Sequence, residues 1–123
     1  MSHIVQIQAQ VRDCAAVRAA CQRLGLAEPT QGKVRLFSAE VQGLAIRLPD
    51  WQYPVVADLA TGHLNFDNFG GRWGRQEHLD RFLQAYAVER SRIEARKKGH
   101  FLTETALPNG AIKLTIQVAG GTA

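Results

Sequence analysis

Residues 63–98 read HLNFDNFGGRWGRQEHLDRFLQAYAVERSRIEARKK, and their periodicity changes from that of a strand to that of a helix. His63–Asp67 reads as a short strand, which the Asx and glycine residues at 67–71 stop. Apolar side chains then recur at helical spacing until Gly99, with basic residues in the last turn. We therefore expect a long helix over Arg75–Lys98. Its apolar stripe consists of Leu79, Phe82, Leu83, Tyr86 and Ile93.

Period-two alternation predicts strands on both sides of this helix. From Val5 to Val11, apolar residues alternate with glutamines, which indicates a half-buried strand. Asp13 then caps a short helix that ends at Leu24, because Gly25 is a natural residue after a helix. Further strands are expected at 33–38, 43–48, 55–59 and 63–67, followed by a hairpin of 101–106 and 111–118 around Asn109-Gly110.

These elements predict a single α+β domain over residues 1–118. We expect a mainly antiparallel sheet of about six or seven strands, with the short and the long helix packed on one face. The length of 123 residues suits one domain, and a hydrophobic content of 46% suits a core that needs no metal or disulfide. Residues 119–123 (AGGTA) are expected to form a disordered tail.

The start of the chain argues for a cytoplasmic location. MSHIVQIQAQVRD lacks the basic region and the continuous apolar region of a secretory signal. No apolar run in the sequence approaches the roughly 20 residues that cross a bilayer as a helix. We therefore expect no membrane partner.

The glycine-rich stretch Gly70–Gly74 (GGRWG) follows a predicted strand and precedes a predicted helix, which is the order found in phosphate-binding loops. It matches neither G-x-x-x-x-G-K-[ST] nor G-x-G-x-x-G. A structural turn is the favoured interpretation, because glycine allows positive φ angles where the chain reverses. A recognition surface and a nucleotide or small-ligand site stay open as alternatives.

Aromatic residues gather around this turn. Five of the nine aromatic residues lie within the 23 residues from 51 to 73. Such rings fill a core when buried and mark a partner site when exposed. The candidate partner-binding residues are Trp51, Tyr53, Phe69 and Trp73, together with Arg72.

The net charge of +4 belongs to one segment, because residues 72–98 hold eight basic and four acidic residues and the remainder holds seven of each. Solvation of a charged helix end is the simplest interpretation. An acidic protein partner or nucleic acid phosphates are the alternatives. The candidate basic patch consists of Arg90, Arg92, Arg96, Lys97 and Lys98.

No catalytic or metal-binding pattern stands out, so no enzyme activity, cofactor or metal is expected. The four histidines lack ligand spacing, and the serines lack a nucleophile-elbow context. Asp58 and Asp67, across a predicted hairpin, are the candidate carboxylate pair for acid–base chemistry. Cys14 and Cys21 would lie about 10 Å apart along a helix, beyond disulfide reach, and we interpret them as core residues.

A resemblance to a known family rests on three stretches: SHIVQIQAQVRD (2–13), FDNFGGRWG (66–74) and HLDRFLQAYAVERSRIEARKKGH (78–100). Together with Trp51–Tyr53, they make nearly the whole chain resemble the hypothetical chloroplast reading frame thirty-five family of bacteria and plastids. That family has no established catalytic residues, so the resemblance implies no activity. Its bacterial members are often encoded near an AAA-type ATPase and a tiny companion protein, which implies an adaptor role by association. Phe69 stands where many members carry tyrosine.

The leading hypothesis is a non-enzymatic interaction or adaptor module that works with a protein partner, and the resemblance makes an AAA-type ATPase the first candidate. Nucleic-acid binding through the basic helix end is the first alternative. A small-ligand or nucleotide site at the glycine-rich loop is the second. The final hairpin also offers an open sheet edge that could pair with another chain.

Overall fold

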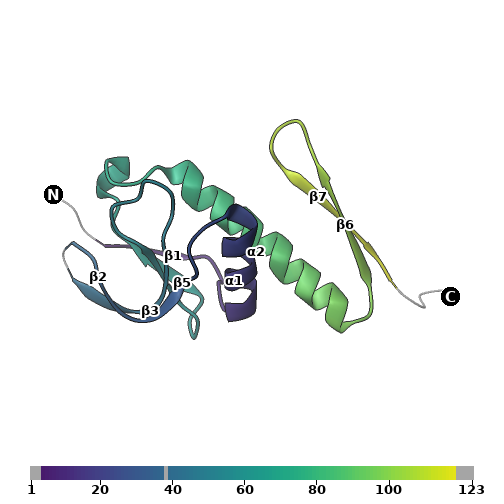
Figure 1. The fold of residues 1–123 in the computed structure, drawn as a ribbon, viewed down its shortest axis with the longest axis horizontal. Coiled ribbons are helices and arrows are strands. Elements are labelled where there is room, and N and C mark those ends of the chain that lie inside the picture. The colour runs from purple at the N-terminus through teal and green to yellow at the C-terminus, as the bar shows by residue number, and fades with distance from the viewer. Residues whose placement is uncertain (1–3, 38, 119–123) are drawn as a thin grey trace.

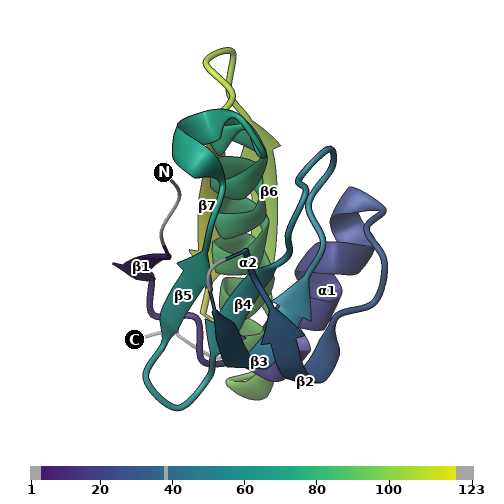
Figure 2. The same cartoon turned by 90° about the vertical axis from the view of Figure 1, so that its left-hand side faces the viewer.

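The computed structural model describes residues 4–37 and 39–118, so the tail predicted at 119–123 lies outside the described residues. An antiparallel sheet has the strand order β1-β5-β4-β3-β2 (Figures 1 and 2). Its strands are β1 (Val5–Gln8), β2 (Thr30–Arg35), β3 (Glu40–Ile46), β4 (Val55–Asp58) and β5 (His63–Phe66).

One face of this sheet is apolar and forms a wall of the core. Leu44 pairs with Ala57, and Ala57 pairs with Leu64, so three small or branched side chains stand in a row across β3, β4 and β5. All three are buried. Because side chains alternate between the two faces of a strand, Ile46 and Phe66 project from this same face.

The short helix, α1 (Cys14–Leu24), has the caps that the sequence predicts. The Asp13 carboxylate accepts a hydrogen bond from the backbone N–H of Ala16 at 3.2 Å, and Gly25 closes the helix in the left-handed conformation with φ 70°. Its residues Ala16, Val17, Ala20 and Cys21 are buried in the core.

The long helix, α2 (Gln76–Lys97), confirms the predicted stripe over its first half, where Leu79, Phe82 and Tyr86 are buried. Its packing against α1 includes a polar contact. The Tyr86 hydroxyl accepts hydrogen bonds from the backbone N–H groups of Arg12 and Asp13, each at 3.1 Å. This contact fixes the start of α1 against the middle of α2.

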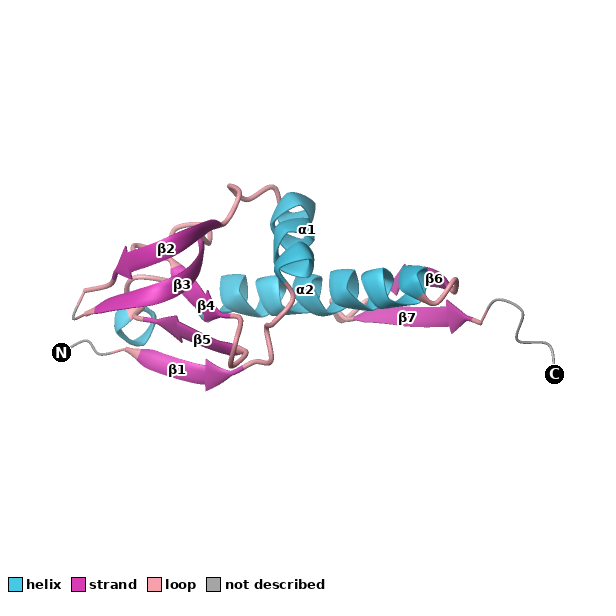
Figure 3. Cartoon of the chain, turned by 90° about the horizontal axis from the view of Figure 1, so that it is seen from below, coloured by secondary structure: helices cyan, strands magenta, loops and turns pink. Residues whose placement is uncertain are grey.

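The final hairpin, β6 (Phe101–Ala106) and β7 (Ile112–Gln117), forms a separate two-stranded sheet beside the C-terminal half of α2 (Figures 2 and 3). The expected α+β fold is confirmed, with seven antiparallel strands and two helices in the described residues. The strands divide into sheets of five and two because α2, at about 1.5 Å per residue, extends beyond the short strands of the first sheet.

Three strand predictions need correction. The first strand was expected to reach Val11 but ends at Gln8, because Gln10 has φ 57° and turns the chain. Val11 then donates its N–H to the Gly62 carbonyl at 2.9 Å and enters the core. The strands predicted at 33–38 and 43–48 are β2 and β3, which lie earlier in the chain, because the bond from Leu36 N–H to the Ala39 carbonyl sets their register.

Candidate functional site

Four aromatic rings form a surface cluster, here called the aromatic patch: Phe37, Tyr53, Phe69 and Trp73. Trp73 lies at its centre, with ring centroids 4.7 Å from Phe69, 5.1 Å from Phe37 and 5.7 Å from Tyr53. Phe37 is 55% exposed, and the other three rings are partly buried. Such stacked and edge-on contacts hold the rings in fixed positions while leaving part of their area open to solvent.

Arg72 adds a positive charge to the aromatic patch. Its guanidinium carbon lies 5.2 Å from the centroid of the Phe69 ring, which is a cation–π contact. The side chain is exposed, and it forms no ion pair with any residue in the described ranges. The patch therefore combines apolar rings with an available cation.

The chain reversal at 67–74 positions two of these rings. Phe69 and Gly71 both have positive φ, 49° and 97°, within the 3-10 turn η1 (Phe69–Gly71). Trp73 is held at both backbone groups, because its N–H donates to the Asn68 carbonyl at 2.9 Å and its carbonyl accepts from Gln52 N–H at 2.8 Å. These contacts support the structural-turn interpretation of the glycine-rich loop, since the turn brings Phe69 and Trp73 into a stack.

Asp67 opens this turn and is almost fully buried, with 1% of its surface exposed. One carboxylate oxygen accepts the backbone N–H of Phe69 at 3.2 Å, whereas Oδ2 has no hydrogen-bond partner among the described residues. The hydrogen bond from Phe69 N–H to the Asp67 carboxylate helps to hold Phe69 in its positive-φ backbone conformation. Asp58 pairs with His63 at the start of β5, whereas Asp67 follows the end of that strand. The two carboxylates therefore do not form a pair for acid–base chemistry.

Trp51 does not belong to the exposed part of this cluster, which corrects its assignment as a partner contact. Only 8% of its surface is exposed. Its ring packs edge-on against Phe66 at 5.6 Å, and its indole N–H donates to the Arg75 carbonyl at 3.0 Å. The ring is therefore part of the core beneath the aromatic patch.

Phe37 is the patch residue that sequence analysis missed, because the strand predicted at 33–38 includes it, whereas β2 ends at Arg35. A signal was present. In the predicted strand 33–38, Phe37 lies two and four residues after Arg35 and Lys33, so the three side chains would project from the same, polar face of the strand. A large aromatic residue on that face predicts an exposed ring.

The candidate basic patch does not form one surface. Arg90 and Lys98 line a cavity beside β7, whereas Arg92 and Arg96 line a different recess near the start of β6. Lys97 lies 4.0 Å from Glu94 in an ion pair. The five cations therefore divide between two flanks of α2, and acidic residues offset part of their charge.

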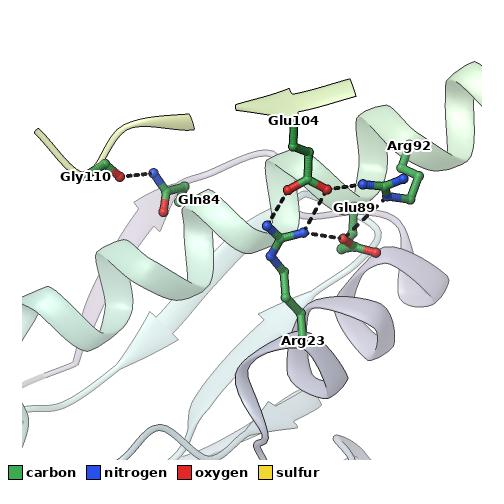
Figure 4. Close-up of polar contacts among 6 residues, drawn as sticks. All are labelled: Arg23, Gln84, Glu89, Arg92, Glu104 and Gly110. Carbon is green, nitrogen blue, oxygen red and sulfur yellow. Dashed lines mark hydrogen bonds and ion pairs between the residues drawn. The ribbon is translucent and has the colours of Figure 1, made fainter. Parts of the chain in front are cut away.

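Arg92 in particular belongs to a cluster of four charged residues that joins α1, α2 and β6, here called the charge clamp: Arg23, Glu89, Arg92 and Glu104 (Figure 4). Arg23 donates to Glu89 and Glu104, each at 3.0 Å, and Arg92 pairs with Glu104. Hydrogen bonds donated by Arg23 and Arg92 lower the pKa of Glu104 to about 2, and the bond that Arg23 donates to Glu104 raises the pKa of Arg23.

Acid should weaken the charge clamp. Glu104 has its pKa lowered from 4.5 to about 2, so its contribution to stability is present above pH 4.5 and is lost as the pH falls toward 2. We expect Glu104→Gln to lower the free energy of unfolding by about 1–2 kcal/mol at neutral pH and to converge with the wild type near the folded-state pKa. Chemical denaturation across this range measures the difference.

The matched control is Glu28→Gln, which removes a surface partner of Arg18. Exposed pairs contribute little, so this variant should follow the wild type at every pH. A Glu104→Gln curve that runs parallel to the wild type down to pH 2 would show that the clamp does not titrate as described.

The described residues contain no group of three or more histidine, cysteine, aspartate or glutamate side chains that could hold a metal ion. Burial raises the pKa of the Cys21 thiol to about 11, which keeps it protonated at neutral pH. Among the described residues, no helix is both long and apolar enough to cross a membrane.

Comparison with protein-family models, with curated proteins and with solved structures gives no significant match for this chain.

Proposed function

We propose that this protein is a non-enzymatic interaction module that binds a protein partner through the aromatic patch and Arg72. The observation that supports the proposal best is the central position of Trp73, which contacts three other rings beside an exposed guanidinium. Aromatic residues and arginine are enriched at protein interfaces, and residues of these types contribute most of the binding energy there.

The geometry favours a preorganised contact surface. Phe37, Tyr53 and Trp73 come from three separate parts of the chain, and their mutual contacts restrain the rings before any partner arrives. Rings already held in place lose little rotational freedom on binding, which favours affinity. Their partly exposed area would be covered by an apolar surface of the partner, and Arg72 would meet an acidic group at its edge.

The resemblance noted in the sequence makes an AAA-type ATPase the first partner to test, with this chain as its adaptor. Nucleic-acid binding has weaker support, because the basic residues of α2 divide between two flanks and Arg92 is held by Glu104. A nucleotide site at Gly70–Gly74 also has weaker support, because this turn already has a structural role: it brings the rings of Phe69 and Trp73 together.

A photo-crosslinking experiment tests which surface the partner contacts. Phe37 and Phe101 are both exposed phenylalanines, at 55% and 67%. Phe37 follows β2 of the five-stranded sheet, whereas Phe101 begins β6 of the separate two-stranded sheet. With benzoylphenylalanine at position 37, irradiation in native lysate should yield a crosslinked protein, identified by mass spectrometry. The variant at position 101 should not yield that product. Equal yields from the two positions, or none from position 37, would count against the aromatic patch.

Replacement of Trp73 by alanine should weaken binding of the crosslinked partner about thirtyfold, which corresponds to a hot-spot loss of roughly 2 kcal/mol. The physical reason is that Trp73 touches every other ring of the patch. Isothermal titration with the purified partner measures the change. Tyr86→Phe, which removes a hydroxyl that bonds the start of α1 and contacts no ring of the patch, controls for general loss of stability.

A further inference from the structure

A second surface, which shares no residue with the aromatic patch, lies along α2 from Leu83 to Lys98. A groove of about 510 Å³ runs between α2, β7 and the residues that follow β1. Leu83, Ala87 and Ala95 of α2 line it together with Ile116 of β7 and Ala9. A volume of this size with a mainly apolar lining can accept several side chains of a bound segment.

One wall of the groove is an open strand edge. The turn of the hairpin contains a hydrogen bond from Leu107 N–H to the Ala111 carbonyl at 2.9 Å, and the pairing continues in register to Phe101 and Gln117. Antiparallel pairs alternate between bonded and non-bonded positions, so the backbone groups of residues 112, 114 and 116 point away from β6. None of them has a hydrogen-bond partner among the described residues.

Side-chain exposure shows that this edge is uncovered. Ile116 is paired with Leu102 and shares its face of the hairpin, yet 51% of its surface is exposed, and Val118 is 56% exposed. The hairpin is anchored elsewhere, by the charge clamp and by a 2.9 Å hydrogen bond from the Gln84 side chain to the Gly110 carbonyl (Figure 4). A strand added about 4.8 Å from β7 would cover Ile116 and extend the hairpin over α2.

The groove also carries a net positive charge. Arg90 and Lys98 line it, and neither forms an ion pair within the described residues. Glu94 lies between them on the helix and is 4.0 Å from Lys97. Arg90 and Lys98 are separated by about 12 Å along α2, which is close to the roughly 13–14 Å between residues i and i+4 of a strand.

We propose that this groove binds an extended, acidic segment of a partner protein, which pairs with the free edge of β7. Alternate side chains of the segment would face α2, with an apolar residue over the floor of the groove. Carboxylates two positions to either side of it would reach Arg90 and Lys98. A second copy of this chain fits less well, because its own β7 (IKLTIQ) brings a lysine and no acid to the two cations.

A synthetic peptide tests the proposal directly. The probe is a nine-residue peptide with glutamate at its third and seventh residues, valine at its fifth and threonine elsewhere. In a strand, the two glutamates and the valine project from the same face. Fluorescence anisotropy should give a Kd on the order of 10–100 µM with the full chain. Hydrogen exchange should show new protection of the amides of residues 112, 114 and 116.

Matched changes separate backbone pairing from charge. N-methylation of the central valine removes the amide that would bond to β7 and should abolish binding. Arg90→Glu/Lys98→Glu should weaken binding at least tenfold, and Arg96→Glu, on the other flank of α2, should leave it unchanged. Trp73→Ala should also leave it unchanged, so failure here would not bear on the aromatic patch.

Three results would overturn the proposal. The first is absence of binding up to about 1 mM peptide. The second is binding that survives N-methylation or leaves the three amides unprotected. The third is a dimer in sedimentation velocity that Ile116→Lys dissociates, because that result would assign the β7 edge to a second copy of the chain.

Discussion

Replacement of Trp51 by alanine is expected to lower the free energy of unfolding by about 3–5 kcal/mol, as for other large buried aromatic residues. The ring is 8% exposed, packs on Phe66 at 5.6 Å and donates its indole N–H to the Arg75 carbonyl. The substitution therefore leaves a cavity and removes one of two hydrogen bonds to the Arg75 carbonyl, which also accepts from the His78 N–H at 3.2 Å. Chemical denaturation followed by circular dichroism measures the loss.

Trp73→Ala is the natural comparison, because the two tryptophans lie close together in the same fold but at different depths. Trp73 is partly exposed, so its replacement should cost roughly 1–2 kcal/mol of stability and act mainly on partner binding. Trp51→Leu retains apolar volume and should recover part of the lost stability. Equal destabilisation by Trp51→Ala and Trp73→Ala would contradict the assignment of Trp51 to the core and Trp73 to the surface.

The sequence could not make this division. Both tryptophans lie in connecting segments, where there is no period of two or 3.6 residues to assign a side chain to the inside or the outside. A helix does have such a period, so Leu79, Phe82 and Tyr86 could be assigned to the core from their spacing. The depth of a loop residue depends on which distant elements cover it. For Trp51 these are β5, through Phe66, and the start of α2.

The basic residues show the same limit for charge. Spacing alone places Arg92 and Arg96 on one flank of α2, which agrees with the recess that they share. It cannot show that Glu104, from a hairpin later in the chain, pairs with Arg92, or that Arg23 joins them from α1. Local periodicity predicts which side of a helix a charge occupies, whereas its partners are set by tertiary contacts.

Gly74→Ala is expected to lower the free energy of unfolding by about 2–3 kcal/mol through steric conflict with Trp51. A Cβ atom at position 74 would lie 2.3 Å from Cδ2, 2.5 Å from Cε2 and 2.6 Å from Cγ of the indole ring. These atoms belong to the rigid centre of a buried ring, so the ring cannot rotate away without disturbing its contact with Phe66. The glycine is therefore required by close approach.

A double-mutant cycle identifies the cause of this loss. In a Trp51→Ala background the conflicting ring is absent, so Gly74→Ala should cost almost nothing there, and the double variant should be about 2–3 kcal/mol more stable than additivity predicts. Asn68 donates its side-chain N–H to the Gly74 carbonyl at 3.2 Å, a bond that a methyl group at Cα leaves intact. If Gly74→Ala were equally destabilising in both backgrounds, its effect would arise from the backbone of the turn, and the indole ring would not be what excludes a side chain at position 74.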